Sequence, residues 1–549
     1  MPAVNITHRL RANAAPLCLL ALALLGFARI FMLRDVYADD NCWLFGIYQG
    51  RDLHGFLDTG FYEMRREGLG VFFYLFYLPF RWMDNPYVVW HGTVLALQLG
   101  APLVLYALVR RLSGDEWRGF FVAVALVVVP LDHVAPYLSG INYRFGLFLG
   151  LLSLYLTDRY AQSGSRRAFI GALLCMLPAE YVFIEATVGF ESARALLLWY
   201  RFRTIRAIAR AWWPFLILGL PLVALKLFFR PYGIYSTTYP TGFGLFFDGE
   251  TLPRLLDMFL FAGWNMLRRF TQYGQLASLV LAFLAAAVLV AYLMQTSRDA
   301  GARRGASTPF FVLLGLAIVL PQIVIFFYAH RPPSLGTEST HAALMQPGHA
   351  LVLGSLVYSV VAWTHSRGLI HRVAIYLLAL FIGIGTFYNN LNLDLFASSS
   401  LAEQRFWHAF RTRFPSLPAQ ADFVIDAEPA PYRRQHRYFN LEDIYGNYEL
   451  EFGINREYRS RDAGNPRRYR VYPFDELMTE YRIHGEALFA KPNIGRHTHY
   501  GVESLDPGEL TVVHYRDGRI LVNREILQRY PKVVYRAWAD KDLPGWMKR

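Results

Sequence analysis

Cysteine is scarce in this sequence, with three residues among 549. Cys18 and Cys175 lie inside apolar runs and Cys42 stands alone between them, so the sequence offers neither a disulfide framework nor a cysteine metal site. A glycine-rich phosphate loop, a Walker pattern and a serine nucleophile elbow are also missing. These absences argue against a nucleotide-driven pump and against a serine hydrolase.

Charged residues are few as well, at 18% of the chain, whereas hydrophobic residues make up 54% and the mean hydropathy is +0.24. The formal net charge of +13 could suggest a nucleic acid partner. The arginines instead form short clusters between apolar runs, where the positive-inside rule places cytoplasmic loops. We therefore predict a protein embedded in a lipid bilayer, with no nucleic acid partner.

The apolar runs predict a mainly α fold, a polytopic bundle with about eleven membrane-spanning helices. Arg9 and Arg11 precede the first run, and its length together with Arg29 and Arg34 favours an uncleaved anchor over a signal peptide. The arginine clusters place the N-terminus in the cytoplasm, the chain in a bacterial inner membrane and the tail in the periplasm. The predicted spans are residues 15–33, 87–109, 120–137, 143–157, 168–179, 181–200, 212–229, 275–294, 309–328, 350–363 and 373–388.

Long loops are expected on the outer face at residues 34–86, 230–274 and 330–349. In the first loop, the aromatic run 71–83 is too short and too interrupted by proline to span, and is typical of a helix lying in the membrane interface. Residues 168–190 could instead form one helix, but a single crossing would put the next arginine cluster outside.

The tail differs from the rest of the chain, which predicts a boundary between a transmembrane domain, 1–392, and a soluble α+β domain, 393–549. A polar linker is expected at 398–400, because charged residues of both signs become frequent after it. Asp517-Gly518 is a hairpin turn signal. The pattern predicts a helix at 401–414 and strands at 423–425, 468–472, 510–515 and 520–522.

Two adjacent carboxylates, Asp39 and Asp40, lie a few residues beyond the outer end of the first span. Acids so close to lipid are costly unless they have a role or a partner. One interpretation is a solvated loop pair or a salt bridge to Arg34 or Arg51. The other is a catalytic site.

The segment Tyr37-Ala38-Asp39-Asp40-Asn41-Cys42-Trp43-Leu44 resembles the acidic-pair motif of the GT-C superfamily of membrane glycosyltransferases. The inside N-terminus, the long first outer loop and the number of spans extend this resemblance over roughly the first 390 residues. The resemblance implies a sugar donor on a polyprenyl phosphate and transfer, with inversion, to an acceptor hydroxyl on the outer face. It places Asp39 at the position of the base and Asp40 beside it, and either could act.

The resemblance also suggests site residues at other outer helix ends. Asp132-His133 matches a place where superfamily members often have another acid, and Arg144 would contact the donor phosphate; alternatively, Asp132 and Arg144 form a plain ion pair. Glu180 would line the cavity, or with Glu185 would cap a turn.

The third outer loop collects cations where a donor phosphate is expected: Arg331 first, then His341 and His349. A metal bound by these histidines and Glu338 has no recognised ligand spacing, so they could equally be surface residues. No cofactor is required by the sequence, and a divalent metal is unsupported.

The predicted function is therefore transfer of a sugar from a polyprenyl-phosphate donor to a periplasmic glycan, lipid or protein. A lipid-linked-sugar flippase or another polytopic transporter is the alternative, and a membrane scaffold is a third. Transporters usually carry repeats and charges near the midplane, whereas the notable charges here lie at outer helix ends.

Overall fold

The structure is a computed structural model, and the chain divides into two compact units. The first comprises residues 1–33, 63–69 and 86–396, and the second comprises 34–62, 70–85 and 397–549. The residues that the structure describes are 13–33, 47, 51–58, 61–62, 66–83, 87–129, 140–183, 185–228, 253, 275–296, 307–329, 343–417, 420–427, 453–454, 468–473, 482–484, 487–490, 503–505, 511–516 and 519–522.

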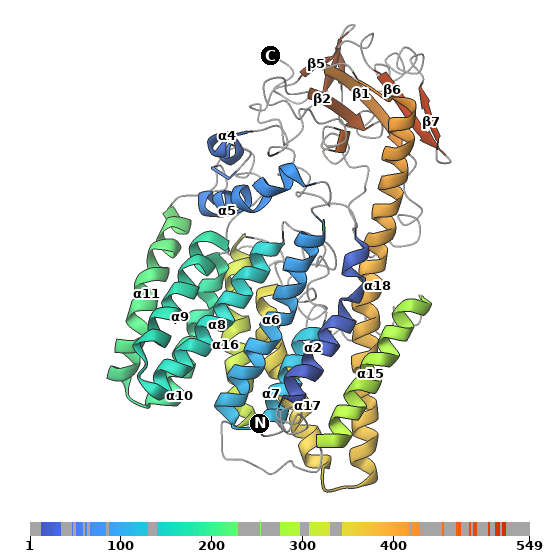
Figure 1. Ribbon diagram of the computed structural model, residues 1–549. Coiled ribbons are helices and arrows are strands. Elements are labelled where there is room, and N and C mark those ends of the chain that lie inside the picture. The colour runs from blue at the N-terminus through green and yellow to red at the C-terminus, as the bar shows by residue number, and fades with distance from the viewer. Residues whose placement is uncertain are drawn as a thin grey trace, which may run out of the picture. The chain divides into compact units, whose positions relative to one another are not determined.

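The first unit is a bundle of helices (Figure 1). As far as they are described, the apolar runs of the sequence coincide with these helical segments, so their helical nature is confirmed. The segments are α2 (Ala14–Gly26), η1 (Ala28–Met32), α6 (Tyr87–Ser113), α7 (Glu116–Val128), α8 (Ile141–Ser163), α9 (Arg166–Pro178), η3 (Ala179–Phe183), η4 (Glu185–Gly189), α10 (Phe190–Phe202), α11 (Ile205–Phe228), α15 (Leu276–Thr296), α16 (Thr308–Ala329), α17 (Gln346–Thr364) and α18 (Leu369–Arg413).

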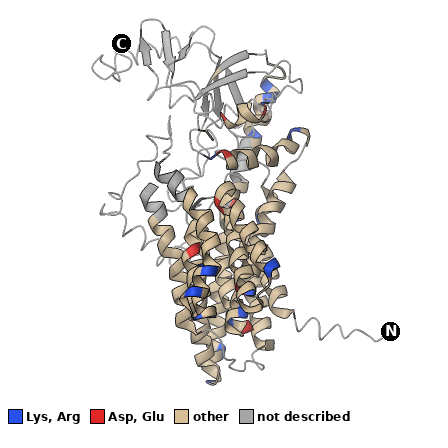
Figure 2. Cartoon of the chain, turned by 90° about the vertical axis from the view of Figure 1, so that its left-hand side faces the viewer, with Lys and Arg blue, Asp and Glu red and all other residues tan. Residues whose placement is uncertain are grey.

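Within the described ranges, four helical stretches are long and apolar enough to cross a membrane: Tyr87–Ser113, Leu276–Thr296, Ala343–Thr364 and Leu369–Asp394. Two further apolar helices are shorter. Figure 2 shows that charged side chains are sparse along the bundle. These features are consistent with membrane association, while the crossings themselves and their number stay a prediction.

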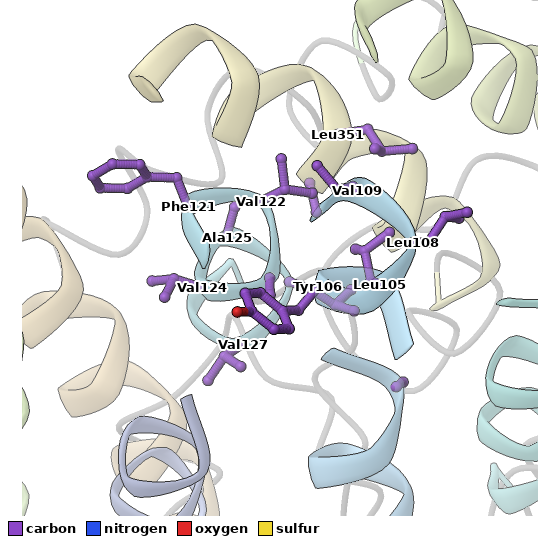
Figure 3. Packing of buried hydrophobic residues seen from close by; sticks show 14 of the residues in the cluster. Leu105, Tyr106, Leu108, Val109, Phe121, Val122, Val124, Ala125, Val127 and Leu351 are labelled. Atoms are coloured by element: carbon purple, nitrogen blue, oxygen red, sulfur yellow. The ribbon is translucent and has the colours of Figure 1, made fainter. Parts of the chain in front are cut away.

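Close helix packing builds the apolar core of the bundle (Figure 3). Leu105 and Val109 of α6 lie in one buried cluster with Val122 of α7 and Leu351 of α17. Gly354 of α17 permits this approach: a Cβ there would lie 2.4 Å from the Cα of Val122. Small residues at such contacts let helices associate in lipid, where no hydrophobic force drives them together.

A buried carboxylate joins three helices at one end of the bundle. Asp158 of α8 is fully buried, and it accepts hydrogen bonds from Arg111 of α6 at 3.1 Å and from Arg201 of α10 at 2.7 Å. All three residues lie near the C-terminal ends of their helices. Helices α6, α8 and α10 therefore run in the same direction, as the alternating arginine clusters predict.

In the second unit, the aromatic run of the first loop is helical, as α5 (Glu67–Tyr77) and η2 (Leu78–Trp82). The preceding helix α4 (Leu53–Leu57) is capped by Asp52, which accepts a hydrogen bond from the Gly55 amide at 2.8 Å. Ring contacts hold this segment together, since the Phe73 ring lies 6.2 Å from Phe61 in a tilted arrangement. The predicted position in a membrane interface is not tested.

The tail contains two small sheets. In the first, β2 (Arg468–Pro473) and β6 (Thr511–Arg516) both run parallel to β1 (Gln420–Ala427), and β7 (Arg519–Val522) pairs antiparallel with β6. The pairing of Arg516 with Arg519 leaves two residues between the strands, as the turn signal predicts. Each predicted strand overlaps one of these four. The second sheet, β3 (Arg482–His484), β4 (Ala487–Ala490) and β5 (Glu503–Leu505), was not predicted.

Helix α18 runs through the predicted linker, because it continues without a break from Leu369 to Arg413. The chain divides into its two units between Phe396 and Ala397, within this helix. The expected linker at 398–400 is wrong. Three consecutive serines are modest helix formers, and neither glycine nor proline occurs near them to end the helix. Downstream, Phe406, Trp407 and Phe410 are buried with Phe423 of β1 and Val513 of β6, which stabilises the end of the helix.

Candidate functional site

The structure describes only part of the predicted site. Arg144, Glu180 and His349 are described. The other predicted site residues lie outside the described residues: Asp39, Asp40, Asp132, His133, Arg331 and His341.

His349 differs from its prediction as a loop residue. It belongs to the first turn of α17, which begins at Gln346, and its side chain is partly buried. The neighbouring Gly348 lies against α16, where a Cβ would be 2.5 Å from the carbonyl oxygen of Gly315. Helix packing therefore fixes the backbone around His349, and the loop of the sequence prediction ends earlier than expected.

The acidic pair comes shortly after a helix end that is held in place by contacts with α18. Segment η1 is followed by Leu33, which is buried and lies six residues before Asp39. Just upstream, the Nε of Arg29 donates to Asp394 of α18 at 2.5 Å, and the Arg29 amide donates to Asn390 at 3.3 Å. These bonds fix the place from which the chain enters the first long loop.

A polar segment on α18 supplies those partners, and it was missed by sequence reasoning. The last span was predicted to end at residue 388, with everything beyond it outside. Asn389, Asn390, Asn392 and Asp394 are instead buried in the bundle. The available signal was Arg29 within the first apolar run, because a charge in a span usually requires a partner from another helix.

His91 is a second residue that sequence reasoning missed. It lies in the first turns of α6, is 2% exposed, and sits beside the backbone of Leu33. Among the described residues, neither ring nitrogen meets hydrogen-bond geometry with a partner. A histidine in an apolar run was the signal. The fold places the His91 imidazole beside Leu33, just before the loop that carries the acidic pair.

Arg144 and Glu180 come from elements that pack against each other. Arg144 lies in the first turn of α8 and is 4% exposed. In the same turn, the Asn142 amide donates to the Phe183 carbonyl of η3 at 3.2 Å, and Phe145 stacks on the Phe183 ring at 4.8 Å. Glu180 belongs to η3 itself. The two predicted residues thus lie on neighbouring segments at one end of the bundle.

The same end also carries His91 and Leu33. Helices α6 and α8 run in the same direction, because Arg111 and Asp158 join their C-terminal parts. Their N-terminal turns, with His91 and Arg144, therefore share the opposite end. The structure brings these described residues to one end of the bundle.

Glu180 is in an unusual environment. It follows Pro178 in a π-helical turn, its side chain is 2% exposed, and both carboxylate oxygens are buried without a hydrogen-bond partner among the described residues. A Cβ at Gly219 of α11 would lie 3.7 Å from each of these oxygens. Single π turns often mark functional sites.

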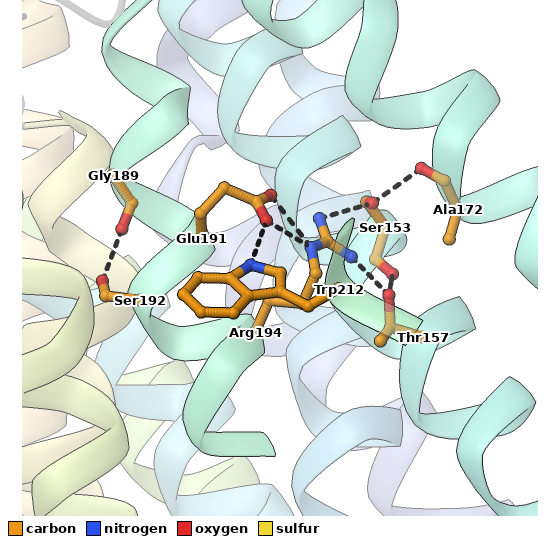
Figure 4. Close-up of polar contacts among 8 residues, drawn as sticks. All are labelled: Ser153, Thr157, Ala172, Gly189, Glu191, Ser192, Arg194 and Trp212. Atoms are coloured by element: carbon orange, nitrogen blue, oxygen red, sulfur yellow. Dashed lines mark hydrogen bonds and ion pairs between the residues drawn. The ribbon is translucent and has the colours of Figure 1, made fainter. Parts of the chain in front are cut away.

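A second buried glutamate is fully paired (Figure 4). Glu191 of α10 accepts hydrogen bonds from the Nε of Arg194, at 2.9 and 3.0 Å, and from the indole of Trp212, at 2.9 Å. The Arg194 guanidinium also donates to Ser153 at 2.9 Å and to Thr157 of α8. The network joins α8, α10 and α11, and we interpret it as a structural link between these helices.

Within the described part of the chain, no three histidine, cysteine, aspartate or glutamate side chains are grouped as a metal site. The requirement for a metal stays open, because the predicted third-loop ligands lie outside that part.

Protein-family models, curated proteins and solved structures were each compared with the chain, and none matches. The resemblance to the GT-C superfamily therefore stays a prediction that depends on the acidic-pair motif and its topological setting.

Proposed function

We propose that the chain is an integral-membrane glycosyltransferase that transfers a sugar from a polyprenyl-phosphate donor to a periplasmic acceptor hydroxyl. The observation that carries the proposal is the position of Asp39-Asp40, six residues beyond an anchored helix end. An outward-facing loop at that point would be open both to a lipid-borne donor and to a water-borne acceptor. The donor is already activated, so no nucleotide is needed outside the cell.

The proposed chemistry assigns one task to the acids and another to the cations. Asp39 or Asp40 accepts the proton of the acceptor hydroxyl as it attacks the anomeric carbon, whose configuration inverts. Arginine and histidine side chains stabilise the departing polyprenyl phosphate. Arg144 supports this role because it is at the same end of the bundle as Leu33. Arg331, His341 and His349 are the further cations that we assign to the phosphate.

The proposal also includes an orientation in the membrane and a role for the tail. The arginine-rich end, which includes Arg111 and Arg201, would face the cytoplasm of a bacterial inner membrane, and the acidic pair would face the periplasm. The tail, with its two sheets and the end of α18, would be a soluble α+β domain that orients the acceptor, which is a glycan, a lipid or a protein.

The test is transfer by the purified full-length protein in lipid nanodiscs, supplied with a panel of polyprenyl-phosphate sugars labelled in the sugar. Label should move to a water-soluble or lipid acceptor extracted from the envelope. Asp39→Asn and Asp40→Asn should each be made, and loss of a general base typically lowers the rate about 100-fold or more.

A matched control is Asp58→Asn, which changes an exposed acid in the same loop. It should transfer at the wild-type rate. Full transfer by both the Asp39 and Asp40 variants would refute the proposal, as would equal losses in the Asp58 variant, which would indicate a general effect of charge in this loop.

A lipid-linked-sugar flippase is the second candidate, and one observation favours it. The helix between Pro178 and Phe190 is irregular and carries the buried Glu180, and discontinuous helices with buried acids are typical of transporters. Movement of a fluorescent polyprenyl-phosphate sugar across proteoliposomes, without any covalent product, would favour this function over transfer.

A further inference from the structure

Glu180 forms no ion pair with any of the described residues. It is 2% exposed, and neither oxygen of its carboxyl group has a hydrogen-bond partner among the described residues. An ionised carboxylate taken out of water and left unpaired is strongly unfavourable, whereas the neutral acid leaves only a hydroxyl and a carbonyl unsatisfied. Burial therefore favours the protonated form.

In the described part of the chain, the nearest cation is already paired with another acid. The charged groups that act on Glu180 electrostatically are Glu191 and Arg194, both of α10. Arg194 lies against Glu191, so the near pair carries no net charge. On its own turn, the Tyr181 hydroxyl donates to the Leu218 carbonyl of α11.

The other packed elements add little charge at this position. A Cβ built on Gly219 of α11 would lie 3.7 Å from each carboxylate oxygen of Glu180 and 3.1 Å from Cγ2 of Val188 in η4, so apolar residues border this position. Helix α8 carries Asn142 and, two residues later, Arg144. The titratable groups on the first turn of α8 are Tyr143 and Arg144, and neither is among the groups that act on Glu180.

The backbone around Glu180 is interrupted in a way that allows movement. Pro178 is followed by the π turn η3 and then by the 3-10 turn η4, so regular α-helix resumes only at Phe190. Among the described residues, two hydrogen bonds hold the turn, one from Tyr181 to α11 and one from Asn142 to Phe183, and the Phe145 ring stacks on Phe183. Either hydrogen bond can be broken without unfolding a long helix.

We propose that Glu180 is a proton-binding site, carried as the neutral acid and deprotonated when the α9–α10 break admits water. The step is a simple acid dissociation, in which the carboxyl O–H bond breaks, its electron pair stays on the carboxylate and the proton passes to water. The proposal does not rest on the proposed transferase function. Glu191 is the internal reference, because it is buried in the same bundle but paired with Arg194.

The test uses the full-length protein in lipid nanodiscs and a hydrophobic carbodiimide, a reagent that reacts with protonated carboxylic acids and leaves a stable N-acylurea. Peptide mass spectrometry should find the Glu180 peptide modified, and the Glu191 peptide clearly less modified, because the Glu191 carboxylate is hydrogen-bonded to and paired with Arg194. Infrared spectra should show a protonated carboxylic acid band that disappears in Glu180→Gln and persists in Glu191→Gln.

Equal labelling of both glutamates, or an acid band that Glu180→Gln leaves unchanged, would overturn the proposal. An acid band without labelling would overturn the exchange with water. If Glu180→Gln fails to fold, the labelling ratio in the wild-type protein and the band position in Glu180→Asp still decide between the protonated and the ionised form.

Discussion

The Nε atom of Arg29 lies 2.5 Å from Oδ1 of Asp394, so the end of the first helical segment is joined to a residue 365 positions later in the chain. Asp394 also accepts a hydrogen bond from Ser278 of α15 at 2.8 Å. These two contacts hold the end of the first helical segment against α15 and α18. The pair is therefore a direct test of how the proposed site is positioned.

Arg29→Met should destabilise the protein by about 2 kcal/mol, because it leaves the buried Asp394 without its cation. The cost is below that of a fully buried pair, since Arg29 is 27% exposed. Asp394→Asn should cost less, because an amide still accepts from Ser278. Thermal unfolding in detergent would measure both, and a double variant no less stable than the worse single variant would confirm the coupling; strictly additive losses would contradict it.

Gly354→Ala should destabilise the bundle by about 2 kcal/mol, because the new methyl group would meet the backbone of α7 at Val122. Gly92→Ala is the matched control, a helical glycine with nothing within 4 Å of an added Cβ. It should be neutral or more stable by about 0.5 kcal/mol, since alanine favours helices. Equal unfolding temperatures for the two variants would show that α7 and α17 do not pack this closely.

Arg194→Met should be among the most damaging single changes, costing about 3 to 5 kcal/mol, because Glu191 would remain buried without its cation. Glu191→Gln combined with Arg194→Met should recover most of that loss, since no charge is left unpaired. Expression level and unfolding in detergent would report the difference. A double variant less stable than Arg194→Met would mean that the hydrogen bonds to Ser153 and Thr157 matter more than the charge pair.

Thiol labelling should place Asp58 and Arg203 on opposite sides of the membrane. In a Cys42→Ser background, Asp58→Cys should react with a membrane-impermeant maleimide on spheroplasts, and Arg203→Cys should react only after permeabilisation. Both native side chains are exposed, so access from water is not limited by packing. Labelling of Arg203→Cys in sealed spheroplasts would reverse the proposed orientation.

Phe410→Ala should open the tail to protease, with a loss of about 3 kcal/mol of stability in the second unit. The Phe410 ring is fully buried and lies 5.6 Å from Phe423 of β1. Arg413→Ala, at an exposed position one turn later, is the control. Limited proteolysis of the whole protein should cut the tail faster only in the Phe410 variant; equal rates would mean that the helix end is not part of this core.

Hydropathy by itself determined that the long apolar runs are helices, because every backbone group in lipid needs a partner within its own segment. Alternating side chains and the Asp517-Gly518 signal likewise located β1, β2, β6 and β7, since short-range patterns set strand identity. The parallel pairing of β1 with β2 and β6 was not predictable, because it joins residues far apart in sequence.

Only the tertiary structure decided which polar side chains are paired. The sequence contains Glu180 and Glu191 eleven positions apart in the same region, yet Arg194 satisfies one and nothing described satisfies the other. The tertiary structure also places Arg29 against Asp394 and His91 beside Leu33. Hydropathy records how much each residue favours lipid, but the partner of a buried charge depends on contacts between helices that no local pattern encodes.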